Sequence, residues 1–252
     1  MKHLAVFASG RGTNFQAILD HTRMGILQNT EVSLLVTNVS DPPVADYAHE
    51  RSVPVSFIEG VFGRKFADKR EKERARDQFD QNALEVLKEN RIDLVALAGF
   101  MQVLGPNLVN AYPMRIMNIH PAKDLARFGG SGMFGDRVHA AVLAAGETES
   151  GCTVHYADHT VDGGPIILQA TVPVEPGDTP ESLAYRILIH EHRTYSKAIQ
   201  LHVDGRIRVV DERLSIDWSN NWEEKWNRRQ EAFIRLQAER SHGPERVLQS
   251  SV

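Results

Sequence analysis

The sequence has few cysteines and no long apolar run. Cys152 is the single cysteine among 252 residues, which excludes an internal disulfide and a cysteine-based zinc cluster and favours a reducing compartment. The apolar run over 4–8 is too short for a signal-peptide core, and no stretch approaches the roughly 20 apolar residues of a membrane span. We therefore expect a cytoplasmic protein without a membrane partner.

The sequence also lacks a large excess of either positive or negative charge. The 29 basic and 33 acidic residues give a net charge of −4, which is too balanced for a protein that binds duplexes by neutralising phosphates. We expect no nucleic-acid partner and favour a small-molecule substrate. The hydrophobic content of 42% is enough for a full core in one α/β domain, alone or with an appendage.

Short β-rich runs alternate with longer helical patterns through the first half of the chain. This alternation predicts crossover helices and a Rossmann-like α/β fold, an open twisted and mostly parallel sheet flanked by helices. Residues 4–57 are typical of a mononucleotide-binding half-sheet, whose ligands lie beyond the carboxyl ends of the strands. The predicted strands of this half are 4–8, 31–37, 53–57, 94–98 and 114–119.

The pattern changes after residue 150. Two strands are predicted over 152–158 and 165–174, followed by a long helix over 180–203 and a last strand over 206–212. We expect a domain over 1–212 and a C-terminal helical extension over 213–252. In that extension three tryptophans recur at every fourth residue, which predicts one helical face packed against the body or against a second subunit, so a homodimer stays open. They are Trp218, Trp222 and Trp226.

The loop after the first strand, residues 9–14, has the sequence SGRGTN. Gly10 and Gly12 permit close backbone approach beside a helix N-terminus, which favours an anion site. The loop lacks the Lys-Ser/Thr ending of a phosphate loop and the three-glycine dinucleotide fingerprint, so the use of nucleoside triphosphates or NAD is not supported. A plain strand-to-helix turn is the alternative.

Polar side chains end the strand predicted over 114–119. Asn118 and His120 are two residues apart, so both side chains leave the same face of the strand, and Pro121 stops the ladder. Carboxyl ends of parallel strands hold ligands, although a buried structural Asn and His would also explain the pair. Asp162 begins an Asp-Gly-Gly turn sequence, and its carboxylate matters for chemistry only if it lies near His120.

Four histidines raise the question of a metal site. They are His155, His159, His190 and His192. The segment lacks an H-E-x-x-H pattern, and the spacing of its carboxylates is generic. We therefore expect no metal.

Four segments together resemble the glycinamide ribonucleotide transformylase family over roughly residues 2–210. They are FASGRGTNFQAIL at 7–19, LVALAGFMQVL at 94–104, MNIHP at 117–121 and GCTVHYADHTVDGGPIILQ at 151–169. The resemblance implies 10-formyltetrahydrofolate as co-substrate and glycinamide ribonucleotide as acceptor, in purine biosynthesis.

The resemblance also implies roles for individual residues. Asn118, His120 and Asp162 would be catalytic, with an ionised Asp162 favouring the imidazolium form of His120. The substrate phosphate would face Gly10, Arg11, Gly12, Thr13 and Asn14, and its ribose would face Glu191. The folate would contact Leu97, Met101, Gln102, Val103 and Leu104.

Two departures from the family pattern leave the acceptor open. Gln102 stands where bacterial members often carry Arg, and the stretch 122–139 is longer than their common loop and lacks its internal proline. These differences admit another amine, such as an amino-sugar nucleotide. Because related formyltetrahydrofolate hydrolases share the Asn-x-His and Asp core, water is a further possible acceptor, and a non-catalytic folate or nucleotide-binding module is the alternative outside enzymes.

Overall fold

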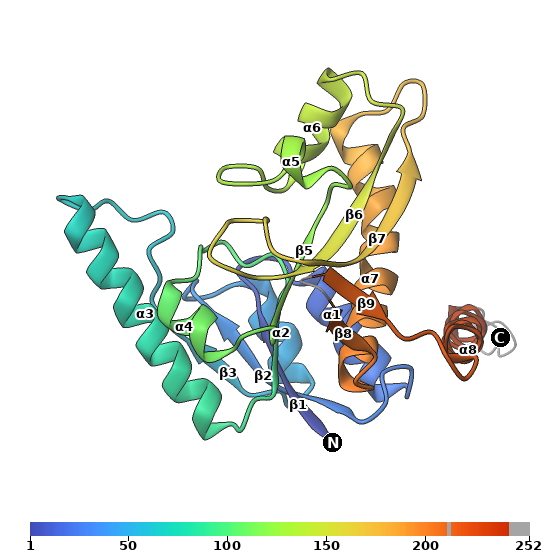
Figure 1. Cartoon of the computed structure of the whole chain (residues 1–252), viewed down its shortest axis with the longest axis horizontal. Coiled ribbons are helices and arrows are strands. Elements are labelled where there is room, and N and C mark those ends of the chain that lie inside the picture. Colours follow the sequence, from blue (N-terminus) through green and yellow to red (C-terminus); the bar gives the residue numbers. More distant parts are fainter. Residues whose placement is uncertain (211–212, 242–252) are drawn as a thin grey trace, which may run out of the picture.

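A seven-stranded sheet forms the centre of the computed structural model, which describes residues 1–210 and 213–241 (Figure 1). The strand order is β3-β2-β1-β4-β5-β6-β7, with β1 to β5 parallel and β6 and β7 antiparallel to their neighbours. The predicted mostly parallel sheet is thereby confirmed. The strands are β1 Lys2–Phe7, β2 Thr30–Thr37, β3 Val55–Phe57, β4 Leu94–Leu97, β5 Ile116–His120, β6 Glu149–Tyr156 and β7 Ile166–Pro173.

Helices cover both faces of this sheet. The longest, α7, spans Pro180–Val203, as its sequence pattern predicts, and begins at a capping box in which Thr179 and Ser182 exchange hydrogen bonds. The others in the main body are α1 Thr13–Arg23, α2 Pro43–Glu50, α3 Lys69–Glu89, α4 Pro106–Ala111, α5 Leu125–Phe128 and α6 Asp136–Ala144.

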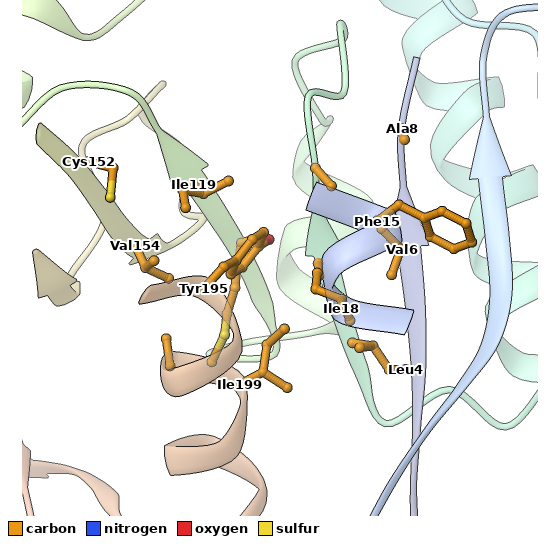
Figure 2. Close-up of a cluster of buried hydrophobic side chains, with 14 of the residues drawn as sticks. Leu4, Val6, Ala8, Phe15, Ile18, Ile119, Cys152, Val154, Tyr195 and Ile199 are labelled. Atoms are coloured by element: carbon orange, nitrogen blue, oxygen red, sulfur yellow. The ribbon is translucent and has the colours of Figure 1, made fainter. Parts of the chain in front are cut away.

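Two apolar clusters join these layers. On one face, Ile18 of α1 and Tyr195 of α7 belong to the same buried cluster as Ile119 of β5 and Val154 of β6 (Figure 2). On the other face, α3 and α4 contribute their own buried side chains, with Phe79 against the sheet. Because both faces are covered, the parallel strands are almost continuously apolar.

The strand order places three loops at one edge of the sheet. From β1 the chain proceeds to β2 on one side, whereas β4 lies on the other side of β1, which makes the gap between β1 and β4 a topological switch point. The loops after β1, β4 and β5 all leave from the carboxyl ends of parallel strands. The predicted ligand-binding residues are concentrated in these loops.

The C-terminal part begins as a hairpin rather than as a helix. Strand β8, Ile207–Val210, pairs with β9, Arg213–Ile216, so the boundary expected at 212 falls between two paired strands. Helix α8 spans Trp222–Ser241, and the rest of the expected extension, 242–252, lies outside the described residues. Trp218 therefore precedes the helix, contrary to the prediction of a single helical stripe.

The tryptophans pack within the chain. The rings of Trp222 and Trp226 are stacked with centroids 5.8 Å apart, and both belong to the main apolar cluster. The indole N–H of Trp222 donates to Asp204 Oδ2 at 2.6 Å, just after α7. In the described ranges, no helix is long and apolar enough to cross a membrane.

Candidate active site

Asn118 and His120 converge on one carboxylate at the end of β5. Asn118 Nδ2 donates to Asp162 Oδ1 at 3.1 Å, and His120 Nδ1 lies 3.4 Å from Asp162 Oδ2. The two β5 side chains thus share a face of the strand, and each lies next to a different oxygen of Asp162. The His120 and Asp162 side chains are only 4% and 9% exposed, and Asn118 is partly buried.

The turn after β6 is built to bring Asp162 into this position. Asp162 has a left-handed backbone with φ 56°, which Asp tolerates better than most residues. A Cβ on Gly164 would lie 1.9 Å from the Tyr156 carbonyl oxygen, so only glycine fits there. The backbone N–H of Gly130 donates to Asp162 Oδ2 at 2.9 Å and helps to fix the orientation of the carboxylate.

His155 is a fourth member of the cluster, although its sequence context suggests only a possible metal ligand. It pairs with Asn118 across β5 and β6, and its Nε2 lies 3.2 Å from Asn118 Nδ2 and 3.5 Å from Asp162 Oδ1. Its Nδ1 lies 2.9 Å from the Tyr156 carbonyl oxygen, which accepts a hydrogen bond if that nitrogen carries the proton. Only the register of β5 against β6 reveals this placement, and no spacing within the sequence encodes it.

The ionisation of the cluster differs from the expectation. Burial lowers the pKa of His120, and the opposing effects of Asp162 and of the Phe128 carbonyl do not offset it. Burial acts to raise the pKa of Asp162, but the contacts with His155, His120 and Gly130 hold it below its usual range. The resting pair is therefore an ionised carboxylate beside a neutral imidazole, not the imidazolium expected from the charge of Asp162 alone.

The predicted anion loop forms the start of α1. Gly12 is the N-cap with φ 69°, and a Cβ there would lie 2.1 Å from Cγ2 of Val44. No side chain caps the first turn of α1, so its N–H groups are available to an anion. Gly10 and Arg11 are exposed beside this turn, and Thr13 is its first helical residue.

Asn14 and Glu191 meet although they are 177 residues apart in sequence. Asn14 Nδ2 on α1 donates to Glu191 Oε2 on α7 at 2.8 Å. Burial raises the pKa of Glu191, and the hydrogen bond from Asn14 acts against this rise. The structure thus joins two of the predicted substrate residues, with the Asn14 amide directed toward Glu191.

The five predicted folate residues lie at the end of β4 and in the segment that follows it. Gln102 Oε1 accepts a hydrogen bond from the backbone N–H of Val61 at 2.7 Å, so this side chain holds the chain after β3. Leu97 and Leu104 belong to the apolar cluster beneath the segment, whereas Val103 is 42% exposed. Met101 is partly buried, and its backbone N–H donates to Ser9 Oγ at 2.8 Å, which ties the ends of β1 and β4 together.

Neither a metal nor a cysteine nucleophile is evident at this edge. In the part of the chain that the structure describes, no group of three or more His, Cys, Asp or Glu side chains is arranged to hold a metal ion. Cys152 is fully buried, and burial raises the pKa of its thiol to about 12. The polar cluster around Asp162 is therefore the candidate reaction centre.

Comparison with known proteins assigns this architecture. The family model described as formyl transferase matches residues 2–199. The chain belongs to the formyl transferase family. Membership favours an enzyme over the non-catalytic binding module considered from the sequence.

Several members of the formyl transferase family are similar over most of this chain. The chloroplastic phosphoribosylglycinamide formyltransferase of Arabidopsis thaliana is 39% identical over 82% of this chain, which spans 67% of that relative. The trifunctional purine biosynthetic protein adenosine-3 of Bos taurus is 37% identical over 82% of this chain, which spans only 19% of it.

Solved structures match over nearly their whole length. Glycinamide ribonucleotide transformylase 1 from Symbiobacterium toebii is 36% identical with a TM-score of 0.74, over 86% of this chain and 94% of that one. The corresponding protein from Geobacillus kaustophilus is 38% identical with a TM-score of 0.69, over 81% and 99% of the two chains. The seven-stranded fold is thus that of the ribonucleotide transformylases.

Proposed function

We propose that this formyltransferase moves the formyl group of 10-formyltetrahydrofolate to the amine of glycinamide ribonucleotide by direct attack. The observation that carries the proposal is the Asp162 carboxylate, whose two oxygens face Asn118 and His120. The uncapped first turn of α1 supports a phosphate-bearing acceptor. The relatives that carry this activity in their names support the same acceptor.

In the proposed reaction the neutral amine nitrogen attacks the formyl carbon. The new C–N bond gives a tetrahedral intermediate with negative charge on the former formyl oxygen. When the bond to the folate nitrogen breaks, that nitrogen gains a proton and the amine nitrogen loses one. No protein nucleophile takes part, in keeping with the buried and protonated thiol of Cys152.

Asn118 and His120 stabilise the oxyanion. The Asn118 amide has two N–H donors, and its Nδ2 faces Asp162 and His155 in the described structure, so oxyanion binding replaces one of these contacts. An oxyanion donor of this kind contributes about 3 to 4 kcal/mol to the transition state. A His120 that gains a proton at Nδ1 during the reaction adds a positive charge near the oxyanion, while its Nε2–H stays on the Phe128 carbonyl.

Asp162 assists the proton transfer. Its ionised carboxylate faces His120 Nδ1, and it can hold the water that carries the proton from the amine to the folate nitrogen. A neutral resting His120 suits this role because it can accept a proton transiently as charge develops. The carboxylate then stabilises the imidazolium that results.

The acceptor is held by the loop over 10–14 and by Glu191, and the folate by the segment that follows β4. We assign the phosphate to the backbone N–H groups at the start of α1, with Gly10, Arg11, Gly12 and Thr13 around it. Glu191, positioned by Asn14, faces the ribose. Leu97, Met101, Val103 and Leu104 line the pterin pocket, and Gln102 contributes by holding the chain at Val61.

A different amine acceptor is the second candidate, and the stretch 122–139 motivates it because its backbone contacts both His120 and Asp162. A formyltetrahydrofolate deformylase from Pseudomonas syringae has a similar fold, but at 22% identity this likeness concerns the fold alone. Cytoplasmic localisation stays a prediction, since plant relatives are named chloroplastic. A homodimer likewise stays a prediction.

An acceptor comparison tests the proposal. The purified protein is supplied with 10-formyltetrahydrofolate and either glycinamide ribonucleotide, an amino-sugar nucleotide or water alone, and both products are quantified. We expect a kcat/KM for glycinamide ribonucleotide at least about 100-fold above that for the other amine, because phosphate and ribose contacts act together. Equal release of tetrahydrofolate with and without an amine would mean hydrolysis and contradict the proposal.

A further inference from the structure

Thr153 lies next to the reaction centre, and its side chain hydrogen-bonds to Ala122 and Gln169. It pairs with His120 across β5 and β6, and with Gln169 across β6 and β7, so the three residues form a row across the sheet. Thr153 is fully buried. A buried hydroxyl needs a hydrogen-bond partner, and the partners of this one lie in the loop that follows His120.

The Thr153 hydroxyl holds the start of that loop. Its Oγ donates to the Ala122 carbonyl oxygen at 2.7 Å, and Gln169 Nε2 donates both to Thr153 Oγ at 2.9 Å and to the Lys123 carbonyl oxygen at 2.6 Å. Pro121 has no N–H to extend the strand ladder. Side chains of β6 and β7 thus hold the backbone just after β5, where the strand ladder ends.

The same loop then returns to the reaction centre. Asp124 accepts hydrogen bonds from the N–H groups of Ala126 and Arg127 and so starts the short helix α5. At the end of α5, the Phe128 carbonyl oxygen lies 2.7 Å from His120 Nε2. Two residues later, Gly130 N–H donates to Asp162 Oδ2.

Other contacts of the loop are weaker candidates for its anchor. Lys123 pairs with Glu149 at 2.5 Å, and Arg127 pairs with Glu147 at 2.5 Å. The side chains of both pairs reach solvent, where ion pairs are screened and contribute little. The buried hydroxyl is therefore the anchor that the loop depends on most.

The contact with Phe128 decides which ring nitrogen of His120 carries the proton. A carbonyl oxygen can only accept, so a neutral His120 hydrogen-bonded to it is protonated at Nε2. Nδ1, which faces Asp162, is then the nitrogen that is free to accept a proton. If the carbonyl moves away, the ring can instead hold its proton at Nδ1 and donate it to Asp162.

We infer that Thr153 is a positioning residue, which holds the loop over 121–128 so that the Phe128 carbonyl keeps His120 protonated at Nε2 and open at Nδ1. The inference rests on the proposed function for its effect on turnover, but the tautomer of His120 can be measured without any substrate. Gln169 supports Thr153 from β7 and is itself exposed, so its substitution has a smaller effect.

The test compares Thr153→Val, which keeps the side-chain shape and removes the hydroxyl, with Thr153→Ser, which keeps the hydroxyl. Ser150→Ala is a matched control, because Ser150 lies on the same strand with a buried hydroxyl that has no partner among the described residues. For Thr153→Val we expect kcat to fall about tenfold or more, as catalytic groups lose their alignment, with KM for the ribonucleotide within about twofold. Thr153→Ser and Ser150→Ala should keep kcat within about twofold.

Ring-nitrogen chemical shifts in the folded full-length variants provide the second readout, with the His120 signals assigned by their absence in a His120→Asn variant. Wild type should show His120 protonated at Nε2, and Thr153→Val a mixture of both tautomers. An unchanged tautomer together with unchanged kcat in Thr153→Val would overturn the inference. If wild type fails to formylate the ribonucleotide, the proposed function fails, and the tautomer measurement still decides the role of Thr153.

Discussion

The imidazole of His120 faces the carboxylate of Asp162, with Nδ1 3.4 Å from Oδ2, in a site where both side chains are almost entirely buried. Burial and charge oppose each other in this pair. Burial destabilises the imidazolium, and the carboxylate stabilises it. Because burial prevails, the pair can take up a proton during the reaction instead of holding one at rest.

The titration of His120 checks this balance. Its pKa is lowered below the ordinary 6.5, so the ring is neutral at pH 7 and gains its proton only on acidification. Asp162→Asn removes the charge that opposes burial and should lower the midpoint further. A protonated His155 also lowers the pKa of His120. A protonated His120 in turn lowers the pKa of His139. NMR titration of the ring carbons measures the midpoint, and a value above 6.5, or a rise in Asp162→Asn, would contradict this account.

Asp162→Asn should also lower kcat by about 100-fold to 10,000-fold, because the water that carries the proton loses the carboxylate that holds it. Binding of glycinamide ribonucleotide should stay within about twofold, since the substituted group lies outside the assigned phosphate and ribose contacts. Asp46→Asn, on the exposed face of α2, is the matched control. Steady-state kinetics and a binding titration separate the two effects. Near-normal turnover of purified Asp162→Asn would remove Asp162 from the mechanism.

Gln102→Met tests the structural role of this side chain. The change leaves the backbone N–H of Val61 without its buried acceptor, so the free energy of unfolding should fall by about 1 to 3 kcal/mol. The KM for the folate should rise as the chain after β3 loosens. Val209→Met, at an exposed position of β8 outside the assigned folate pocket, should change neither quantity. Urea unfolding gives the free energies, and equal values for Gln102→Met and wild type would mean that the bond to Val61 is dispensable.

The C-terminal tryptophans should act within one chain. Trp226 is 2% exposed and stacks on Trp222, so Trp226→Ala should lower the free energy of unfolding by about 3 to 5 kcal/mol. Trp218 is 41% exposed, and Trp218→Ala should cost less than about 1 kcal/mol. Chemical denaturation at two protein concentrations measures both losses. A loss for Trp226→Ala that depends on protein concentration would instead place the tryptophans at a subunit interface.

The sequence predicts those parts of this site that depend on local periodicity. Alternation along a strand is enough to place Asn118 and His120 on one face, and the apolar pattern over 180–203 is enough for α7. Asp162 and His155 reach the same point through the pairing of β5 with the antiparallel β6, a long-range arrangement without a local signature. For that reason the resemblance, and not the spacing, indicated Asp162.

Other differences arise from tertiary contacts. The spacing of Trp218, Trp222 and Trp226 fits one helix, but the turn before α8 excludes Trp218 from it. Gln102 lies in the segment predicted to contact the folate, yet its amide oxygen accepts a hydrogen bond from the backbone N–H of Val61. In both cases the sequence indicates the residue and its segment, but the contact that the side chain makes depends on the tertiary structure.

The fate of the formyl group is the most direct measure of the central claim that Asn118, His120 and Asp162 support direct transfer to a ribonucleotide amine. The protein is mixed with 10-formyltetrahydrofolate labelled in the formyl carbon, with and without glycinamide ribonucleotide, and the label is followed through a single turnover. We expect all label that leaves the folate to appear on the ribonucleotide, in equal amount to tetrahydrofolate, and none to become attached to the protein. Label released as formate, or bound covalently to the protein before the ribonucleotide is added, would contradict this claim.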